Sequence, residues 1–443
     1  FSYLWFSMEK AFKNEIKSQF PYLSNSKILL AVSGGVDSVV LAHLCKIAKL
    51  DFTLAHCNFN LRDEESDADE DFVAALAKKL NVKLFVENFD TEQYAKDNSM
   101  SIQMAARDLR YEWFEELRLK HQFDFILTAH HANDSLETFF INLIRGTGLE
   151  GLSGINADSN YIIRPLLNFS RKEILAYAEE NKISWREDST NASTKYLRNK
   201  IRHELVPVLE EINPQFLETF LKTQSHLKEN EELIEDYLSL LYPKIIGKTE
   251  YGYSLDINYL KKVPNSSAIL YQLLKSFGFT EWNDVYHLLD AQPGKMVFST
   301  SHRLIKDRDY LLLTEIDKTE DKVYKIAKNE DFAMLPMGTF SFSEVKEIND
   351  KRSNCIYINP EKLEFPLTVR KWQQGDIFYP FGMKGKKKLS DFFKDKKLSL
   401  PEKENSWLLC SGEKIVWVIN QRADRRFSIT SSDQKIIKIT FSL

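Results

Sequence analysis

Residues 33–38 spell Ser-Gly-Gly-Val-Asp-Ser, which places two adjacent glycines beside two hydroxyls and one carboxylate. An apolar run at 28–32 precedes this loop and a helical pattern at 38–49 follows it. The loop is therefore expected at the carboxyl end of a strand, where open parallel sheets bind ligands. Glycines let backbone amides approach a phosphate, and the start of a helix attracts an anion. The loop thus predicts a phosphate-binding site.

Asp37 is the unusual member of this loop. A carboxylate beside a polyphosphate repels it unless a divalent cation lies between them, and Mg²⁺ is commonly held by one or two carboxylates together with phosphate. We therefore expect Mg²⁺ on Asp37. The alternative is a glycine turn without a ligand, in which Asp37 only caps the following helix.

A second group of polar residues lies within residues 126–148. A strand is expected to end at His130 and His131, and Asp134 and Glu137 lie three residues apart, hence on one face of the next helix. Two carboxylates there could hold an ammonium group or a metal. Alternatively, Asp134 complements the helix dipole and the histidines are structural. Because this group and the glycine loop fall at the same edge of the sheet, we favour a shared site.

The elements that must position these residues follow from the apolar pattern. Short continuous apolar runs, typical of strands buried on both faces, alternate with longer stretches of helical spacing. The strands are expected at 28–32, 52–55, 82–86 and 125–128, and the helices at 38–49, 64–80 and 101–119. This order predicts a Rossmann-like parallel sheet with right-handed crossovers, an α/β domain over residues 1–213.

The remainder of the chain divides by its pattern into three further parts. A capping box at 170–173 and a helix from about 194 to 211 precede a break at Asn213-Pro214. Residues 214–316 are expected to form a small, mainly helical domain, with strands near its end. A charged connector is expected at 317–336. Residues 337–443 carry β-branched and aromatic runs that predict a strand-rich α+β domain.

The composition excludes several classes of protein. The 443 residues carry a net charge of −4, and no apolar run reaches the roughly 18 residues that would span a bilayer. The four cysteines are scattered without a CxxC pair, so neither a zinc knuckle nor an iron–sulfur cluster is indicated, and a cytoplasmic location is expected. Met8 is expected to be the natural start, with residues 1–7 an upstream extension.

The motifs resemble those of a known family. SGGxDS is the motif of the PP-loop pyrophosphatases, which cleave ATP to AMP and pyrophosphate to adenylate a carbonyl-type oxygen. Six pieces in the same order resemble the tRNA(Ile)-lysidine synthetase family: SGGVDS at 33–38, HCNFNLR at 56–62, AARDLRY at 105–111, TAHHANDSLET at 128–138, IRPLL at 163–167, and REDSTNAS with YLRNKIR between 186 and 202. The resemblance implies that ATP adenylates the C2 oxygen of the first anticodon cytidine of a CAU-anticodon isoleucine tRNA, and that the ε-amine of free L-lysine displaces AMP.

The resemblance also implies site residues. Asp134 and Glu137 would receive the lysine ammonium group, Glu137 would act as general base, and His130 would assist catalysis. Arg110 and Arg198 would anchor substrate groups, since guanidinium is a bidentate partner for carboxylate and phosphate; surface exposure without a ligand is the alternative. We expect ATP to contact Ala31, Ser33, Gly34, Gly35, Val36, Asp37, Ser38, His56 and Arg107. Two positions depart from the family pattern, Phe59 in place of a histidine and Asn133 in place of an acid.

A basic segment at 382–397 is the expected tRNA contact. It holds seven lysines against two aspartates, a composition suited to phosphates, and it resembles a family element in the carboxyl-terminal domain. The alternative is a solvated face. The lysines expected to bind RNA are Lys384, Lys386, Lys387, Lys388 and Lys394.

Three rival functions are distinguishable from sequence. Another PP-loop tRNA modifier, such as a tRNA thiolase, would usually carry paired cysteines. An amidotransferase-type synthetase would need an ammonia-supplying domain, which residues 215–443 do not reveal. A non-catalytic RNA-binding protein would not need Asp37, Asp134 and Glu137 together. Dimers are common among such enzymes, so the resemblance also allows a homodimer.

Overall fold

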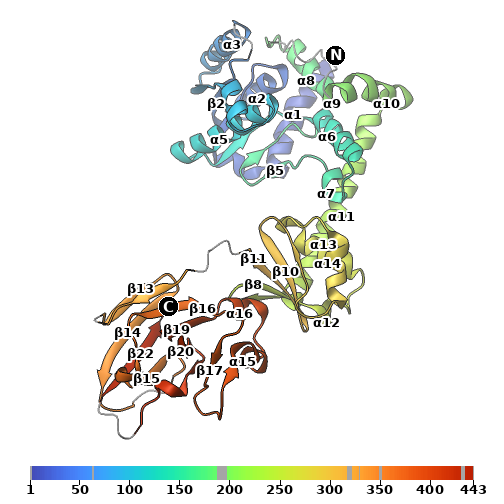
Figure 1. Ribbon diagram of the computed structural model, residues 1–443. Coiled ribbons are helices and arrows are strands. Elements are labelled where there is room, and N and C mark those ends of the chain that lie inside the picture. Colours follow the sequence, from blue (N-terminus) through green and yellow to red (C-terminus); the bar gives the residue numbers. More distant parts are fainter. Residues whose placement is uncertain are drawn as a thin grey trace. The chain divides into compact units, whose positions relative to one another are not determined.

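The computed structural model describes residues 2–61, 64–186, 197–316, 322–328, 330–348, 352–430 and 435–442, with side chains from residue 8 onward and none for residue 64. The chain forms two compact units, Phe1–Glu235 and Asp236–Leu443, which are described separately (Figure 1). Two expectations fall outside the described part of the chain. One concerns the upstream extension at residues 1–7, whose side chains are not described, and the other concerns residues 187–193 of the REDSTNAS stretch.

A six-stranded sheet with the order β3-β2-β1-β4-β6-β5 forms the centre of the first unit. The four predicted strands are confirmed and are parallel. β6 continues the parallel sheet, whereas β5 is antiparallel to it. The pattern missed β5 and β6 because two residues are too short to show a period. The strands are β1 (Lys27–Ala31), β2 (Asp51–Asn58), β3 (Leu84–Asn88), β4 (Phe125–Leu127), β5 (Asp158–Ser159) and β6 (Ile162–Ile163).

Helices cover both faces of this sheet (Figure 1). Ile28 and Leu30 of β1 pack into the core cluster that α1, α2, α3 and α8 share, whereas Leu29 packs on the other face with Trp113 and Phe114 of α5. This alternation is what a strand buried on both faces requires. The helices of the unit are α1 (Ser2–Gln19), α2 (Val36–Ile47), α3 (Glu64–Leu80), α4 (Thr91–Asp97), α5 (Ile102–His121), α6 (Ala132–Arg145), α7 (Leu149–Leu152) and α8 (Arg171–Glu180).

The segment after α8 differs in detail from the predicted single helix at 194–211. Its described part consists of α9 (Leu197–Lys200), a π-helical turn (Ile201–Leu205) and α10 (Val206–Ile212). π-helical turns inside helices are frequent at functional sites, and Arg202 lies on this one. The predicted capping box is present, because Ser170 Oγ accepts from the Glu173 amide and Glu173 accepts from the Ser170 amide.

The long helix α11 (Phe216–Ile245) follows, and the second unit then contains more strands than the helical pattern predicted. A five-stranded antiparallel sheet, β7-β8-β11-β10-β9, packs with short helices around a core that includes Leu270 and Leu304. Its elements are β7 (Ile246–Thr249), β8 (Gly252–Asp256), α12 (Ile257–Leu260), α13 (Ser266–Leu274), α14 (Trp282–His287), β9 (Met296–Phe298), β10 (His302–Asp307) and β11 (Tyr310–Glu315).

The last part of the chain is rich in antiparallel strands, as predicted. Two sheets share one core, β12-β16-β19-β20-β21 and β13-β14-β22-β15, and the hairpin of β17 with β18 leads into α15. The elements are β12 (Tyr324–Ile326), β13 (Phe332–Leu335), β14 (Gly338–Val345), β15 (Cys355–Ile358), β16 (Leu367–Lys371), β17 (Ile377–Phe378), β18 (Lys387–Lys388), α15 (Leu389–Asp395), α16 (Leu400–Glu404), β19 (Trp407–Ser411), β20 (Lys414–Val418), β21 (Arg422–Ala423) and β22 (Ile436–Ser442).

The connector expected at 317–336 is wrong for part of its length. β12 and β13 lie within it and pair with β16 and β14, and Ile326 is fully buried. The charged residues around β12 masked a strand of only three residues. Residues 317–321 lie outside the described residues, and the other domain boundaries stay predictions.

Candidate active site

The glycine loop joins β1 to α2 through hydrogen bonds within itself. Ser38 Oγ donates to the Gly35 carbonyl (2.9 Å) and accepts from the Ser33 amide (3.2 Å). Gly34 has a φ of 91°, a left-handed conformation that favours glycine. Gly35 is the N-cap residue of α2, which places Asp37 in the first helical turn. The loop thus presents a helix start and two hydroxyls, as a phosphate site requires.

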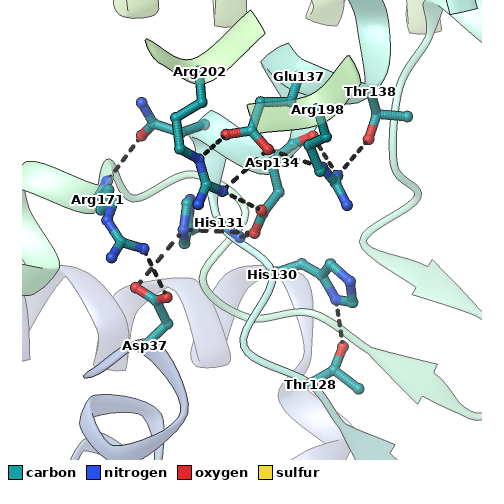
Figure 2. A network of polar contacts seen from close by, with 11 residues as sticks. Asp37, Thr128, His130, His131, Asp134, Glu137, Thr138, Arg171, Arg198 and Arg202 are labelled. Carbon is teal, nitrogen blue, oxygen red and sulfur yellow. Dashed lines mark hydrogen bonds and ion pairs between the residues drawn. The ribbon is translucent and has the colours of Figure 1, made fainter. Parts of the chain in front are cut away.

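Asp37 faces the start of α6 across the edge of the sheet (Figure 2). Its Oδ1 lies 3.7 Å from Nε2 of His131, and the same nitrogen lies 3.6 Å from Oδ2 of Asp134. Asp134 also accepts a hydrogen bond from the His131 amide at 3.0 Å. The two groups that sequence placed at one sheet edge are therefore in contact through His131.

The surroundings of Asp37 fit a divalent cation. Its Oδ1 is buried without a hydrogen-bond partner in the described structure, and its Oδ2 contacts Nη1 of Arg171 at 3.2 Å. No group of three or more His, Cys, Asp or Glu residues among the described residues could hold a metal by itself. Mg²⁺ would therefore take Asp37 as its protein carboxylate and complete its shell with phosphate oxygens and water.

Glu137 is buried behind the site, and two arginines already compensate its negative charge. Its side chain is 1% exposed, Arg202 contacts both of its oxygens at 2.5 and 3.1 Å, and Arg198 Nε contacts Oε2 at 2.8 Å. Figure 2 shows the two guanidinium groups around this carboxylate. Both oxygens of Glu137 already accept from guanidinium groups and its side chain is buried outside the cavity lining, so the geometry does not support it as lysine ligand or general base. The helical period placed it on the face of Asp134 but could not give its depth.

His130 and Asp134 differ in charge at pH 7. Burial lowers the pKa of His130 to about 4, and the charges of three nearby arginines act in the same direction against the opposite effect of Asp134. The His130 imidazole is therefore neutral at pH 7, with Nδ1 hydrogen-bonded to Thr128 Oγ1 at 2.9 Å. Burial opposes ionisation of Asp134, but the imidazoles, Arg198 and the His131 amide more than offset it and lower the pKa of Asp134.

A cavity of about 270 Å³ lies between the two groups. Six expected site residues that line it are Ala31, Ser33, Asp37, Ser38, His130 and Asp134. The expected anchors Arg110 and Arg198 also line it, together with apolar side chains that include Phe59 and Tyr111. The cavity thus has a polar end at the loop and an apolar end beyond it.

Five expected ATP contacts and Glu137 are not among the lining residues. Gly34, Gly35 and Val36 belong to the loop itself. His56 is 3% exposed, and its Nδ1 is hydrogen-bonded at 2.8 Å to the carbonyl of Val32, so it supports the loop from behind. Arg107 is exposed and lies over the ring of Tyr111 at 5.0 Å. Direct ATP contact by His56 and Arg107 stays a prediction that this arrangement does not favour.

The sequence is similar to known proteins over nearly its whole length. Family models match three segments: a PP-loop domain at residues 8–209, a TilS substrate binding domain at 248–316 and a TilS substrate C-terminal domain at 367–439. A tRNA(Ile)-lysidine synthase of Parabacteroides distasonis is 42% identical over 420 residues, covering 94% of this chain and 95% of its own. The synthase of Bacteroides thetaiotaomicron is 39% identical over 426 residues, covering 95% and 97%. The chain belongs to the tRNA(Ile)-lysidine synthase family. The predicted family, fold class and PP-loop ligase activity are confirmed.

The two departures from the pattern of this family have defined surroundings. Phe59 stacks on Phe89 with ring centroids 5.8 Å apart, and the Arg110 guanidinium lies over the Phe59 ring at 5.2 Å from its centre. The ring thus forms part of the cavity wall. Asn133 accepts a hydrogen bond from the Arg171 amide at 2.9 Å, which ties the start of α8 to the start of α6.

Sequence reasoning missed four residues of this candidate site: Thr128, His131 as a bridge, Arg171 and Arg202. Arg202 lies in the YLRNKIR stretch, and the basic residues beside it are a sequence signal that could have identified it as a site residue. Arg171 was noted only as part of a capping box. It lies 134 residues from Asp37 in sequence, so no local pattern could pair them.

The lysine segment of the second unit is mostly exposed. Lys384, Lys386, Lys388 and Lys394 are exposed, whereas Lys387 forms an ion pair with Asp395 on α15. Phe392 and Phe393 are buried and anchor α15 on the core. Four of the five predicted lysines are therefore free to meet phosphate, and Lys387 is less suited.

Proposed function

We propose that this chain joins L-lysine to C2 of the first anticodon cytidine of a CAU-anticodon isoleucine tRNA through an adenylated tRNA intermediate, releasing AMP and pyrophosphate. The observation that carries the proposal is the convergence of the glycine loop with His130 and Asp134 on one cavity, in a chain that belongs to the lysidine synthase family. Activation by ATP and attack by lysine are then each assigned to a different wall of the cavity.

The loop wall suits ATP. The amides at the start of α2 and the hydroxyls of Ser33 and Ser38 would bind phosphate, and the apolar residues Cys57 and Phe59 lie where an adenine could pack. Asp37 would hold Mg²⁺, which when bound neutralises phosphate charge. The cytidine oxygen attacks the α-phosphorus, and the bond from that phosphorus to the bridging oxygen breaks.

The wall at α6 suits lysine. Asp134 is ionised because its pKa is lowered, and it is the carboxylate that faces the cavity, so it would bind the ε-ammonium group. An amine must be unprotonated to attack. The neutral imidazole of His130 lies in the same cavity, and because its pKa is lowered it would orient the amine as a hydrogen-bond acceptor rather than act as a strong base. We assign these roles to Asp134 and His130 in place of Glu137, whose charge the two arginines compensate.

A sulfur-inserting activity is disfavoured by the only cysteine that lines the described cavity. Burial raises the pKa of the Cys57 thiol to about 12, so the thiolate that sulfur chemistry needs is scarce at pH 7. Among the described residues, no helix combines the length and the apolar character that a membrane span needs. A cytoplasmic location and a homodimer remain predictions.

The test supplies a CAU-anticodon isoleucine tRNA transcript with ATP, Mg²⁺ and radiolabelled lysine. We expect label in the RNA that depends on ATP, and none with a transcript whose first anticodon base is U. Absence of label with a folded protein and the CAU transcript contradicts the proposal. A parallel reaction with radiolabelled cysteine or sulfide tests sulfur insertion, for which we expect no incorporation.

A further inference from the structure

The ion pair between Asp37 and Arg171 lies at the point where a metal would bind. Arg171 Nη1 contacts Asp37 Oδ2 at 3.2 Å, and the side chains are 35% and 24% exposed (Figure 2). The carboxylate of Asp37 attracts both the guanidinium and Mg²⁺, and these two cations repel each other. Metal binding to Asp37 must therefore weaken the interaction with Arg171.

Arg171 differs from the other two arginines near these carboxylates. Arg198 and Arg202 hold Glu137 between them, and Arg202 also lies 3.7 Å from Asp134. Within the described residues, the carboxylate that Arg171 contacts is that of Asp37 alone. When Asp37 binds a metal cation, Arg171 therefore loses its carboxylate partner. Its guanidinium charge is then available to bind another anionic group.

The backbone of Arg171 is fixed, so its side chain must find its new partner nearby. Its amide donates to Asn133 Oδ1 at 2.9 Å, and the capping box of Ser170 closes the start of α8. Ile174 and Tyr177 on the same helix are buried in the core of the sheet. The guanidinium already contacts Asp37, a residue of the loop at 33–38, so it starts beside the place where the polyphosphate is proposed to bind.

We propose that Arg171 exchanges partners during the reaction: it neutralises Asp37 in the free protein and binds the β- and γ-phosphates once the metal and ATP are in place. When the bond between the α-phosphorus and the bridging oxygen breaks, the electron pair stays on that oxygen. Arg171 then donates N–H groups to the pyrophosphate that carries the new charge. This inference rests on the proposed ATP-dependent function and assigns a leaving-group role within it.

Binding of Mg²⁺ with inorganic pyrophosphate to the full chain tests the inference by calorimetry, without tRNA or lysine. Arg171→Ala should weaken this binding by about tenfold or more, the loss expected for a charge-assisted hydrogen bond, while AMP binding changes by less than about twofold. Arg171→Lys should keep part of the affinity. Lys172→Ala, the exposed neighbour on α8, is the matched control and should bind as the unmodified chain does.

A second measurement uses Mg²⁺ alone. Arg171→Ala should bind it several-fold more tightly, because the competing cation is gone. An unchanged affinity for Mg²⁺ would overturn the exchange, and an unchanged pyrophosphate affinity, or equal losses for pyrophosphate and AMP, would overturn the leaving-group role. Failure of the proposed function has a different result: no lysine in tRNA from an unmodified chain whose pyrophosphate binding is intact.

Discussion

The cavity of the first unit and the lysine segment of the second handle charge in opposite ways. Behind the cavity, Glu137 is buried between two arginines, and in the cavity wall Asp134 shares His131 with Asp37. In the segment at 382–397, four of the five predicted lysines are exposed. Buried pairs fix positions and cost much to break, whereas exposed cations give salt-dependent affinity and tolerate change. The comparison predicts that chemistry and stability depend on the first region and RNA affinity on the second.

The largest expected effect is on Asp37. Asp37→Asn removes the charge that would hold the metal, and the rate of pyrophosphate release should fall about 10²- to 10³-fold or more. Binding of tRNA should change by less than about twofold. A filter-binding assay beside a pyrophosphate assay separates the two, with Asp51→Asn at the other edge of the sheet as control. Loss of both activities together would show that Asp37 is structural.

Breaking the buried pair tests the stability side of the comparison. Arg202→Met leaves Glu137 with one partner and should lower the free energy of unfolding by about 3 kcal/mol, measured by urea denaturation. Adding Glu137→Leu removes the stranded charge and should restore much of that loss. Lys200→Met, two residues away in an exposed pair with Glu204, should cost under about 1 kcal/mol. Equal costs for Arg202 and Lys200 would contradict the buried-pair account.

The lowered pKa of His130 predicts a pH dependence of stability. The unfolded chain protonates this imidazole near pH 6.5, whereas the folded chain does so only near pH 4. Stability should therefore fall as the pH drops from 6.5 to 4, by up to about 3 kcal/mol from this group, and change no further below it. Unfolding free energies over this range should show a flatter profile for His130→Gln. Identical profiles would place His130 in a more solvated site.

The smallest effect is expected in the lysine segment. Replacing Lys384, Lys386 and Lys388 by Ala should weaken tRNA binding about tenfold and reduce its salt slope by about one unit for each phosphate that these lysines neutralise. Lys387→Ala should leave the salt slope nearly unchanged, because Lys387 pairs with Asp395. Binding titrations from about 50 to 200 mM salt distinguish the two variants. A slope unaffected by the triple change would assign the segment to a solvated face.

The loop and the order of elements could be predicted because their determinants are local. The SGGVDS loop needs only its own glycines and the helix start after it, and continuous apolar runs identified the four main strands. Short elements escaped this reasoning. β5 and β6 have two residues each and β12 has three, so too few side chains exist to show a period, and pairing with distant strands decides their form.

What the sequence by itself determined is a nucleotide loop, a pair of acids on one helix face and a lysine-rich segment, together with the family that combines them. Only the tertiary structure decided which acid faces the cavity. Arg198 and Arg202 reach Glu137 across 61 and 65 residues of chain, and Arg171 reaches Asp37 across 134. The helical period gives the direction of a side chain. Its burial and its contacts with charged residues that are distant in sequence decide whether its carboxylate remains free to bind substrate.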